Sequence, residues 1–384
     1  MTDSIVERAS GRSGERVADK ARERIYNFSP GPAALPLHVL REIQRDLLSY
    51  PGAGASILEI SHRSATMDAI LAETEANLRG LLAIPDHYRV LFMQGGARLQ
   101  FSMVPLNLLR GRSQPAQYVL TGSWGEQAAV EARREGTVSI AWDGAADGYR
   151  RVPAAGELTI DPGAAYVHIT SNETIQGVQF PSEPEVGAPT LVCDASSYFL
   201  SRPIEIERYG LLYACAQKNA GPAGLTLAIV RDDVLERCAD GLHTMLDYRQ
   251  FAESRSLVNT PPVFAIYVLM LVTRWLRKEM GGLEGIAELN RRKAQSLYQV
   301  LDALPEFYIG HAHRDSRSTM NVTFRLPDGD LEKAFLKEAD KRGLSQLKGH
   351  RSVGGIRASI YNAMPLEGVE SLRHFMTEFH KRHG

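Results

Sequence analysis

Hydrophobic residues recur along this chain in two alternating patterns. Short continuous apolar runs, such as YRVLFM, AAYVHIT and LLYACAQ, are separated by segments such as WGEQAAVEARREG, in which apolar residues return every three or four positions. Runs of the first kind are typical of strands buried on both faces, and segments of the second kind are typical of amphipathic helices. Their alternation predicts an α/β fold with a mainly parallel central sheet that helices cover on both faces.

The pattern changes after about residue 282. Long amphipathic segments, among them GLEGIAELNRRKAQSLYQVLDAL, surround only two strand-like pieces, MNVTFRL and IRASIYN. We therefore expect a large domain over 37–282 and a smaller α+β domain over 283–384, which the extended segment 25–36 joins. Residues 1–24 mix Arg with Asp and Glu and lack an apolar stretch, so they predict a disordered extension rather than a signal or transit peptide.

Charge and cysteine usage narrow the class of protein. The chain has 44 Lys and Arg against 45 Asp and Glu, and this balance argues against nucleic acid or an anionic membrane as the main partner. The most apolar segment, VFAIYVLMLV, is too short to span a bilayer. Cys193, Cys215 and Cys238 form neither a CxxC pair nor a metal-ligand spacing. We expect a soluble protein of the reducing cytoplasm, without a metal site.

One charged residue, Lys218, stands between two apolar runs in LLYACAQKNAGPAGLTLAIV. The small residues around it leave room for a bulky group beside the backbone. Partial burial should also lower the pKa of its amine, as a Schiff-base nucleophile requires. For this stretch alone, a lysine that extends to solvent is the alternative.

Asp194 ends the preceding apolar run, TLVCD. A carboxylate at the end of a buried strand is costly unless it is paired, and pyridoxal phosphate needs an anion beside its pyridinium nitrogen. A helix N-cap or a turn is the alternative role. Because the carboxyl ends of parallel strands meet at one edge of a sheet, Asp194 and Lys218 together indicate a cofactor site more specifically than either does alone.

Other loops at the same predicted edge carry suitable groups. The glycine turn of MQGGARLQF could present backbone N–H groups and Arg98 to a phosphate, and Trp124 could stack on an aromatic ring. Thr174, Asn259 and Thr260 add hydroxyl and amide groups in loops. Neither GxGxxG nor GxxxxGK[ST] occurs, which argues against the dinucleotide and Walker types of site.

Cationic pairs recur in loops that contain Gly or Ser. His62 and Arg63 lie in LEISHRS, and His350 and Arg351 lie in LKGHRSVGGIRAS, which also contains Arg357. Such pairs are often simply solvated, but their number exceeds what one carboxylate would need. Arginine binds carboxylate and phosphate with two parallel hydrogen bonds, so we predict a substrate that carries both groups.

Taken together, these motifs resemble a known family. NFSPGPAALP, SHRS, GGARLQF, SWGEQA, SNETIQGVQF, CDASSYFLSRPI, AQKNAGPAGLTLAIVR, NTPPVFAIY and KGHRSVGGIRASIYNAMP are similar, in this order, to the motifs of the phosphoserine aminotransferases. These enzymes are a class-V branch of the fold-type I enzymes that use pyridoxal phosphate. The similarity covers nearly all of the chain from Tyr26. It departs at Ala97, where relatives often have a third glycine, and over residues 1–24, which are either a dispensable tail or the result of a misplaced start codon.

The resemblance implies a role for each matching residue. Lys218 would form the Schiff base and move the proton, Asp194 would pair with the pyridinium nitrogen, and Trp124 would stack on the ring. The remaining cofactor contacts would come from Thr174 at the polar edge of the ring, from Ala97, Arg98 and Gln217 at the phosphate, and from Asn259 and Thr260 of the neighbouring subunit. Substrate would be held by Arg63 and Arg357 at the carboxylate and by His62, Arg98, His350 and Arg351 at the phosphoryl group. A homodimer with shared sites follows from these assignments.

The reaction implied is the reversible transamination between glutamate and 3-phosphohydroxypyruvate, which gives O-phospho-L-serine and 2-oxoglutarate. This is a step of serine biosynthesis. Some bacterial relatives also aminate the 4-phosphohydroxythreonine precursor of vitamin B6, so pyridoxine biosynthesis is a second role that the resemblance leaves open.

Three rival functions are weaker. A serine or alanine–glyoxylate aminotransferase would leave the cationic pairs unmatched, and a cysteine desulfurase needs a late cysteine, whereas none follows Cys238. A non-catalytic protein that only binds small anions would have no need of both Lys218 and Asp194.

Overall fold

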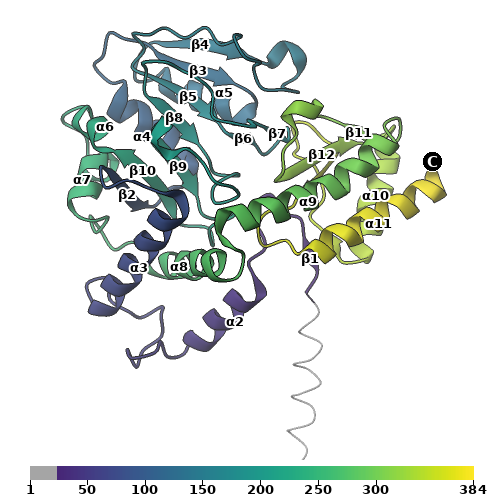
Figure 1. Ribbon diagram of the computed structural model, residues 1–384, viewed down its shortest axis with the longest axis horizontal. Coiled ribbons are helices and arrows are strands. Elements are labelled where there is room, and N and C mark those ends of the chain that lie inside the picture. The colour runs from purple at the N-terminus through teal and green to yellow at the C-terminus, as the bar shows by residue number, and fades with distance from the viewer. Residues whose placement is uncertain (1–23) are drawn as a thin grey trace, which may run out of the picture.

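A computed structural model describes residues 24–384, which form a large α/β part and a smaller α+β part (Figure 1). The disordered extension expected over residues 1–24 lies, apart from Arg24, outside the described residues. Within residues 24–384, no helix combines the length and the apolar character that crossing a membrane would require.

The large part is built on a seven-stranded sheet. In spatial order its strands are β2 (Tyr88–Met93), β10 (Thr226–Arg231), β9 (Tyr209–Cys215), β8 (Leu191–Asp194), β5 (Tyr166–Thr170), β3 (Ala116–Leu120) and β4 (Val138–Asp143). Only β10 runs antiparallel to its neighbours, so the predicted mainly parallel sheet is confirmed. The connection from β9 to β10 is the short loop 216–225, and a loop without a crossover helix can join only antiparallel neighbours.

Alternate residues along the strands point to opposite faces of the sheet, and most of those in the inner strands are buried. In β2, Val90 and Phe92 belong to one hydrophobic core, whereas Leu91 and Met93 belong to the other. One face is covered by α3 (Ala65–Leu82) and α8 (Val263–Lys278), and the other by α4 (Gly96–Leu108), α5 (Ser123–Ala132), α6 (Asp232–Glu236) and α7 (Tyr248–Glu253). This double cover explains why the strands are continuously apolar rather than alternating.

The smaller part has its own core. Its elements are α9 (Gly282–Ala303), α10 (Gly329–Lys341), α11 (Leu366–His383), β11 (Ile309–Gly310), β12 (Asn321–Arg325), β13 (Leu344–Ser345) and β14 (Ile356–Ser359). The strands β11, β12 and β14 form an antiparallel sheet, and Phe335 lies among the aromatic side chains packed behind it. The N-terminal strand β1 (Tyr26–Asn27) pairs in parallel with β13, which ties the start of the described chain to this part. Helix α2 (Leu37–Asp46) follows and extends away from the body of the molecule (Figure 1).

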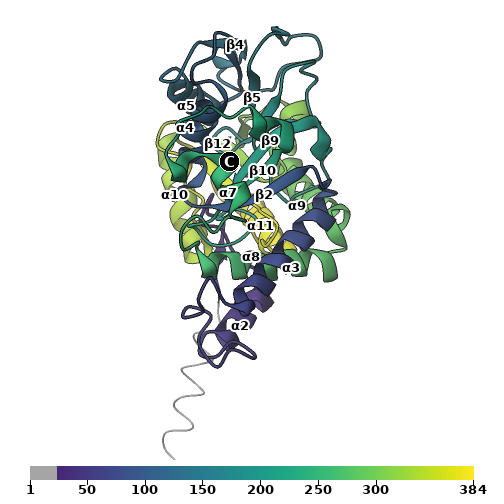
Figure 2. The same cartoon turned by 90° about the vertical axis from the view of Figure 1, so that its left-hand side faces the viewer.

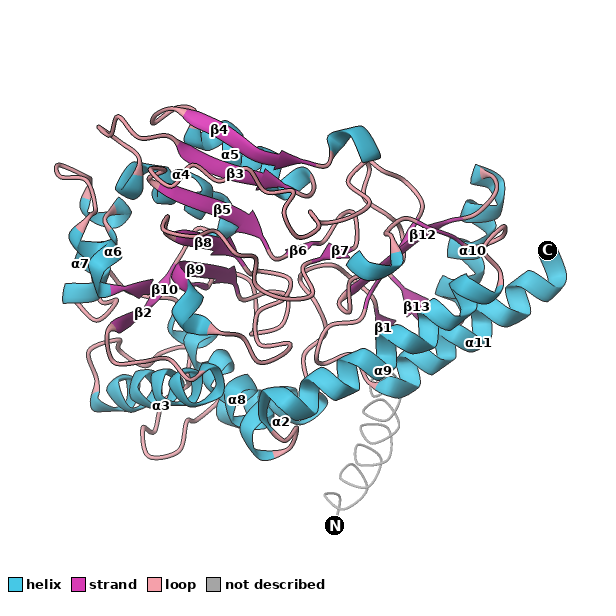
Figure 3. Cartoon of the chain, turned by 45° about the horizontal axis from the view of Figure 1, so that its top comes forward, coloured by secondary structure: helices cyan, strands magenta, loops and turns pink. Residues whose placement is uncertain are grey.

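Six strands of the large sheet, β2, β3, β4, β5, β8 and β9, run in the same direction. Their carboxyl ends therefore share one edge of the sheet, where ligands of parallel sheets bind. The loops that leave this edge, including the hairpin of β6 (Asn172–Glu173) and β7 (Val178–Gln179), lie between the sheet and the smaller part (Figure 3).

Candidate active site

A cavity of about 490 Å³ lies at this edge of the sheet. Most of the site residues predicted from the sequence line this cavity: Ala97, Arg98, Trp124, Thr174, Asp194, Gln217, Lys218, His350 and Arg357. They come from the ends of five strands and from the β14 region of the smaller part, segments separated by up to about two thirds of the chain. The parallel direction of the strands brings these loops together.

Lys218 lies in the turn that follows β9 and is partly buried at the cavity. Its Nζ donates a hydrogen bond to Thr174 Oγ1 at 2.9 Å, and it lies 5.9 Å from the centre of the Trp124 ring. Thr174 is itself buried in the loop after β5. The amine therefore points into the cavity between a hydroxyl group and an aromatic face, and the solvent-exposed alternative is wrong.

The predicted lowering of the pKa of Lys218 is wrong. Burial does act to lower the pKa of this amine, but the acidic side chains of Tyr361 and Cys215 act in the opposite direction. The carboxylates of Asp194 and Glu173 add to this effect, and the net pKa is raised above its ordinary value of 10.5. Burial of this amine was foreseeable from the sequence, whereas the acidic groups around it are brought there by the fold from distant segments.

Asp194 ends β8 and is only 4% exposed. Its Oδ1 accepts a hydrogen bond from the backbone N–H of Ser196 at 2.9 Å, and burial raises the pKa of the carboxyl group. Within residues 24–384, Oδ2 accepts no hydrogen bond. A buried carboxylate oxygen that lines a cavity without a donor fits a ligand that brings its own N–H and positive charge, as a protonated pyridine nitrogen does.

The glycine turn before α4 fits a phosphate. Gly95 and Gly96 both have left-handed backbones, with φ of +91° and +66°, and a Cβ on Gly95 would lie 2.4 Å from the Leu99 side chain. The first N–H groups of a helix have no acceptor within the helix, so those of α4 are free to bind an anion that enters the cavity. Arg98 lies on this first turn, and its guanidinium is 5.8 Å from the Trp124 ring. The donors, the aromatic face and the buried anion together fit pyridoxal phosphate.

Trp124 is held in place by a residue that sequence reasoning missed. Helix α5 has Gly122 at its N-cap and no capping side chain of its own. Glu173, from β6, supplies the cap: its two carboxylate oxygens accept the backbone N–H groups of Trp124 at 3.1 Å and Gly125 at 2.9 Å. Burial raises the pKa of Glu173 to about 7, although both hydrogen bonds act to lower it. The available signal was a single charged residue in the otherwise neutral stretch ITSNETIQG.

Two predicted cations meet at the cavity from the smaller part. Arg357, in β14, is buried, and its Nη1 donates to the carbonyl oxygen of Thr174 at 3.5 Å, whereas its Nε has no hydrogen-bond partner among residues 24–384. Burial lowers the pKa of this guanidinium. The imidazole of His350 contacts Ser352 Oγ at 2.7 Å through Nδ1, and burial, with help from the charges of Arg357 and Arg351, lowers its pKa. A buried guanidinium nitrogen without a partner fits an anionic substrate.

Five predicted residues do not line the cavity of this chain. His62 and Arg63 lie in the turn before α3, and Arg351 is exposed beside His350. Asn259 and Thr260 lie before α8, where Gln94 Nε2 contacts Asn259 Oδ1 at 3.4 Å and the carbonyl oxygen of Thr260 at 3.2 Å. Their roles at cofactor and substrate therefore stay predictions.

The cavity also has residues that the prediction left without a role. Pro30 and Gly31 lie against the Lys218 turn, where Ala33 N–H donates to the carbonyl oxygen of Gln217 at 2.9 Å. Cys215 lines the wall, although the sequence reading treated it as a small buried side chain only. Pro30 and Gly31 line the cavity because the N-terminal segment crosses the edge of the sheet at this point. No local sequence pattern predicts that crossing.

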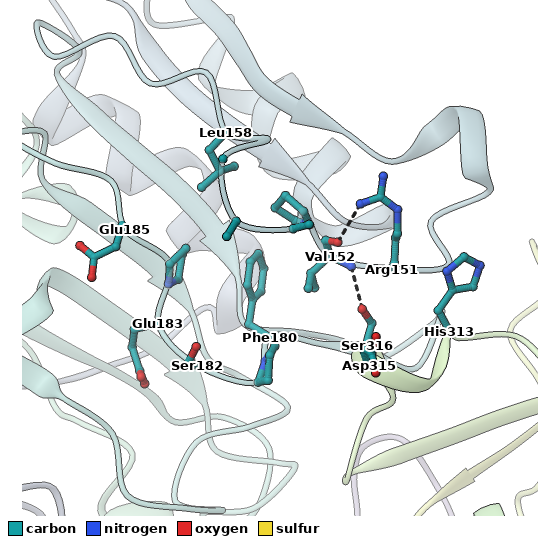
Figure 4. A pocket seen from close by; sticks show the side chains of 16 residues that line it. Arg151, Val152, Leu158, Phe180, Ser182, Glu183, Glu185, His313, Asp315 and Ser316 are labelled. Carbon is teal, nitrogen blue, oxygen red and sulfur yellow. Dashed lines mark hydrogen bonds between the residues drawn. The ribbon is translucent and has the colours of Figure 1, made fainter.

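A larger cavity, of about 720 Å³, lies elsewhere, between segments around Val152, Phe180 and His313 (Figure 4). Several of its polar groups already have partners. Arg151 binds Glu157, the backbone N–H of Val152 donates to Ser316 Oγ at 3.1 Å, and Glu183, outside these contacts, binds Arg202 at 3.1 Å. None of the predicted site residues lines it, so size alone would misplace the active site.

Comparison with known families gives a match to the model described as aminotransferase class-V, over residues 25–372. Among curated proteins, the phosphoserine aminotransferase of Rhodopirellula baltica is 55% identical over 358 residues, which cover 93% of this chain and 95% of the relative.

Solved structures agree with this match. The phosphoserine aminotransferase of Bacillus circulans subsp. alkalophilus has a TM-score of 0.92 and 48% identity, and the comparison covers 94% of this chain and all of that one. A pyridoxal-phosphate-bound phosphoserine aminotransferase from Trichomonas vaginalis has a TM-score of 0.87 and 38% identity over 92% of this chain and all of that one.

Proposed function

The chain belongs to the class-V aminotransferase family, and from this premise we propose that it is a phosphoserine aminotransferase. It exchanges the amino group of glutamate for the keto oxygen of 3-phosphohydroxypyruvate, so that O-phospho-L-serine and 2-oxoglutarate are formed. The observation that carries this conclusion is the placement of the Lys218 amine, the Asp194 carboxylate and the buried Arg357 guanidinium around one cavity.

Four groups of the chain would hold pyridoxal phosphate. Lys218 Nζ would bind it covalently, Asp194 Oδ2 would accept the N–H of its ring, Trp124 would cover the ring face and the start of α4 would bind its phosphate. When bound, the cofactor supplies an aldehyde for the amino group and a ring that accepts the electron pair left by the broken Cα–H bond.

The remaining steps belong to residues of this chain. With the cofactor bound, Lys218 Nζ would take the proton from the substrate Cα and deliver it to the aldehyde carbon of the cofactor, on the other side of the amino nitrogen, because it is the only amine that lines this cavity among the described residues. Thr174 Oγ1, which accepts a hydrogen bond from this amine, orients it. Glu173 fixes the first turn of α5, and thereby the plane against which Trp124 positions the ring.

The cations decide which acid is bound. Arg357 is placed to bind the carboxylate common to both substrates, whereas His350 and Arg98 offer donors to a phosphoryl group. Glutamate ends in a carboxylate and phosphoserine in a phosphate, so several adaptable donors suit the pair better than one rigid clamp. Because serine and alanine would leave these donors unpaired, the site favours a phosphorylated substrate.

We also propose a homodimer with shared sites. Leu48 is 87% exposed and Leu58 is 62% exposed on the segment that projects with α2, just before His62 and Arg63 (Figure 2). Apolar side chains at such exposure favour a protein partner. A second copy would cover them, and it could bring Asn259 and Thr260, which do not reach the cavity of their own chain, to the cofactor phosphate of its partner.

Complementation between two inactive variants tests the shared site. Lys218→Ala lacks the catalytic amine, and the double variant Asn259→Ala, Thr260→Ala lacks the proposed contribution to the neighbour. After mixing and refolding, half of the dimers should be mixed, each with one intact site, so about a quarter of the wild-type activity should return. No recovery in a mixture that light scattering shows to contain dimers would contradict the shared site.

The compartment is also a proposal. Cys193, Cys215 and Cys238 are all buried and unpaired. Free buried thiols are typical of proteins that work in a reducing cytoplasm.

The activity itself is tested with a coupled assay that compares phosphoserine, serine and alanine as amino donors to 2-oxoglutarate. We expect phosphoserine to be preferred by at least about two orders of magnitude in kcat/KM. Equal turnover of serine would contradict the phosphate site, and protein that stays colourless with added pyridoxal phosphate would favour a non-catalytic anion-binding protein. The same assay with the amino acid 4-phosphohydroxythreonine as donor tests the second role.

A further inference from the structure

A second buried lysine lies outside the cavity. Lys293, on α9, is 0% exposed. Its Nζ contacts four backbone carbonyl oxygens, those of Ile360 at 3.0 Å, Tyr361 at 2.7 Å, Asn362 at 3.5 Å and Met364 at 3.1 Å. Among residues 24–384 it makes no salt bridge. A buried amine is costly, so a lysine with only carbonyl partners calls for an explanation.

The segment that Lys293 holds continues β14, the strand that carries Arg357. After Ser359 the chain leaves the sheet and turns, so its carbonyl groups have no strand partner. Buried carbonyl groups need donors, and the amine supplies them from one atom. One turn earlier on α9, Asn290 Nδ2 donates to Asn362 Oδ1 at 2.8 Å and to the carbonyl oxygen of Ser201 at 3.1 Å.

The same segment touches the loop of the catalytic amine. The backbone N–H of Asn362 donates to Oδ1 of Asn219, the residue after Lys218, at 3.0 Å. Asn362 Nδ2 donates to the carbonyl oxygen of Leu200 in the loop after β8 at 2.7 Å.

A second contact reaches the N-terminal segment that lines the cavity. Tyr361 donates its hydroxyl to the carbonyl oxygen of Pro30 at 2.9 Å. Residues 360–364 therefore connect α9 and β14 of the smaller part both to the Lys218 loop and to the Pro30 segment beside it.

We propose that Lys293 is a positioning residue for transamination: by holding the carbonyl groups of residues 360–364, it fixes Asn362 against the Lys218 loop and Tyr361 against Pro30. The inference rests on the function proposed above. Lys293 touches neither substrate nor cofactor, and it acts through Asn219 on the direction of Lys218 and through β14 on the position of Arg357. Small displacements of such groups have large effects on rate, because the reacting atoms must lie within a narrow range of distance.

Two substitutions separate the roles of this amine. Lys293→Met keeps the length of the side chain and removes every donor, whereas Lys293→Gln keeps two N–H donors. Arg292→Met, at the neighbouring exposed position of α9, is the control for the loss of one positive charge. We expect kcat/KM for phosphoserine to fall at least about tenfold in Lys293→Met, to recover partly in Lys293→Gln and to stay unchanged in the control.

Hydrogen–deuterium exchange provides a readout besides activity. In the wild type, the N–H groups of Ala220 and Gly221 donate to the carbonyl oxygen of Ala216 at 3.0 and 2.8 Å. We expect Lys293→Met to speed exchange both in residues 360–364 and in residues 216–221, with and without pyridoxal phosphate. Faster exchange confined to residues 360–364, or kcat and KM within about twofold of wild type, would overturn the proposal.

If Lys293→Met does not fold, the same two measurements on Lys293→Gln decide between these outcomes, because its donors keep part of the contacts. Failure of the proposed function has a different appearance: the wild type would then not transaminate phosphoserine, while the exchange experiment would still test the connection between Lys293 and the Lys218 loop.

Discussion

Two buried regions of this molecule each contain one lysine, and they shift the pKa of its amine in opposite directions. Lys218 lies at the edge of the large sheet, beside a cavity, with the Asp194 and Glu173 carboxylates close enough to raise its pKa. Lys293 lies inside the smaller part, with four carbonyl oxygens around its Nζ, and burial lowers its pKa to about 7. The same side chain can react in one setting because a cavity adjoins its amine, and it is structural in the other because carbonyl oxygens surround its amine.

Tyr361 connects the two regions. Its backbone carbonyl oxygen accepts a hydrogen bond from Lys293, and its ionisable hydroxyl is the strongest influence that raises the pKa of Lys218. The two lysines are therefore neighbours through one residue, although 75 positions separate them in the sequence. Substitutions that remove the features in which the two regions differ should therefore have separate effects on activity and stability.

The largest effect should come from Lys218→Ala. Removal of the amine that lines the cavity should lower kcat at least about 10³-fold while the protein stays folded, because the change takes a partly buried charge out of the structure. Activity is measured in the coupled assay, and mass spectrometry after borohydride reduction detects cofactor bound to the peptide. Lys337→Ala, at an exposed position, is the control. Retained turnover would contradict the assignment of Lys218 as the catalytic amine.

The next effect should come from Asp194→Asn, which keeps the size of the side chain and removes its charge. We expect kcat to fall about 10²–10³-fold, because an amide cannot hold a protonated ring nitrogen. The pKa of Lys218 should also fall, since Asp194 helps to raise it. The rate is measured by kinetics of the loaded enzyme, and the pKa of the amine is measured by titration of the cofactor-free protein. An unchanged rate would mean that Asp194 only stabilises its own turn, through the hydrogen bond that it accepts from the backbone N–H of Ser196.

Because Lys293 is buried, the free energy of unfolding of the protein should depend on pH. Its pKa is about 7 in the folded chain and near the ordinary value of 10.5 in the unfolded chain. Between these values the unfolded chain binds a proton that the folded chain has released, so the free energy of unfolding rises with pH. Relative to Lys293→Met, the wild type should gain on the order of a few kcal/mol over this window. Denaturant unfolding at several pH values measures it, and a constant difference would show that the carbonyl oxygens keep the amine charged.

His350→Ala tests how the cavity distinguishes its acids. We expect kcat/KM for phosphoserine to fall about tenfold and that for glutamate to fall less, because His350 is placed for the phosphoryl group whereas Arg357 serves both substrates. Half-reaction kinetics followed by absorbance separate the two substrates. His313→Ala, beside the other cavity, is the control. An equal loss for both acids would contradict this division.

The smallest effect should come from Glu173→Gln. A glutamine can accept only one of the two N–H groups that Glu173 binds at the start of α5, and its own N–H₂ would face the other. We expect the free energy of unfolding to fall by about 1–3 kcal/mol and kcat to fall a few-fold as Trp124 loses its fixed position. Glu236→Gln, at an exposed position, is the control. A variant as stable and as active as wild type would show that the cap does not position Trp124.

Much of the fold was predictable because its signals are local. The apolar runs and helical periods predicted the mainly parallel sheet, and small residues around Lys218 indicated space beside it. The pKa of Lys218 was not predictable in the same way, because Tyr361 and Glu173 reach it from distant segments. Nor did the single charge in ITSNETIQG show that Glu173 caps a helix that begins 50 residues earlier.

By itself, the sequence determined the strands, the helices and the chemical groups available at the strand ends, because these depend on the periodicity and type of neighbouring residues. Only the tertiary structure decided which of those groups meet. It placed nine predicted residues around one cavity and left Asn259, Thr260, His62, Arg63 and Arg351 outside it. It also gave Lys218 anions and Lys293 carbonyl oxygens as neighbours, and charge and solvation act through space rather than along the chain.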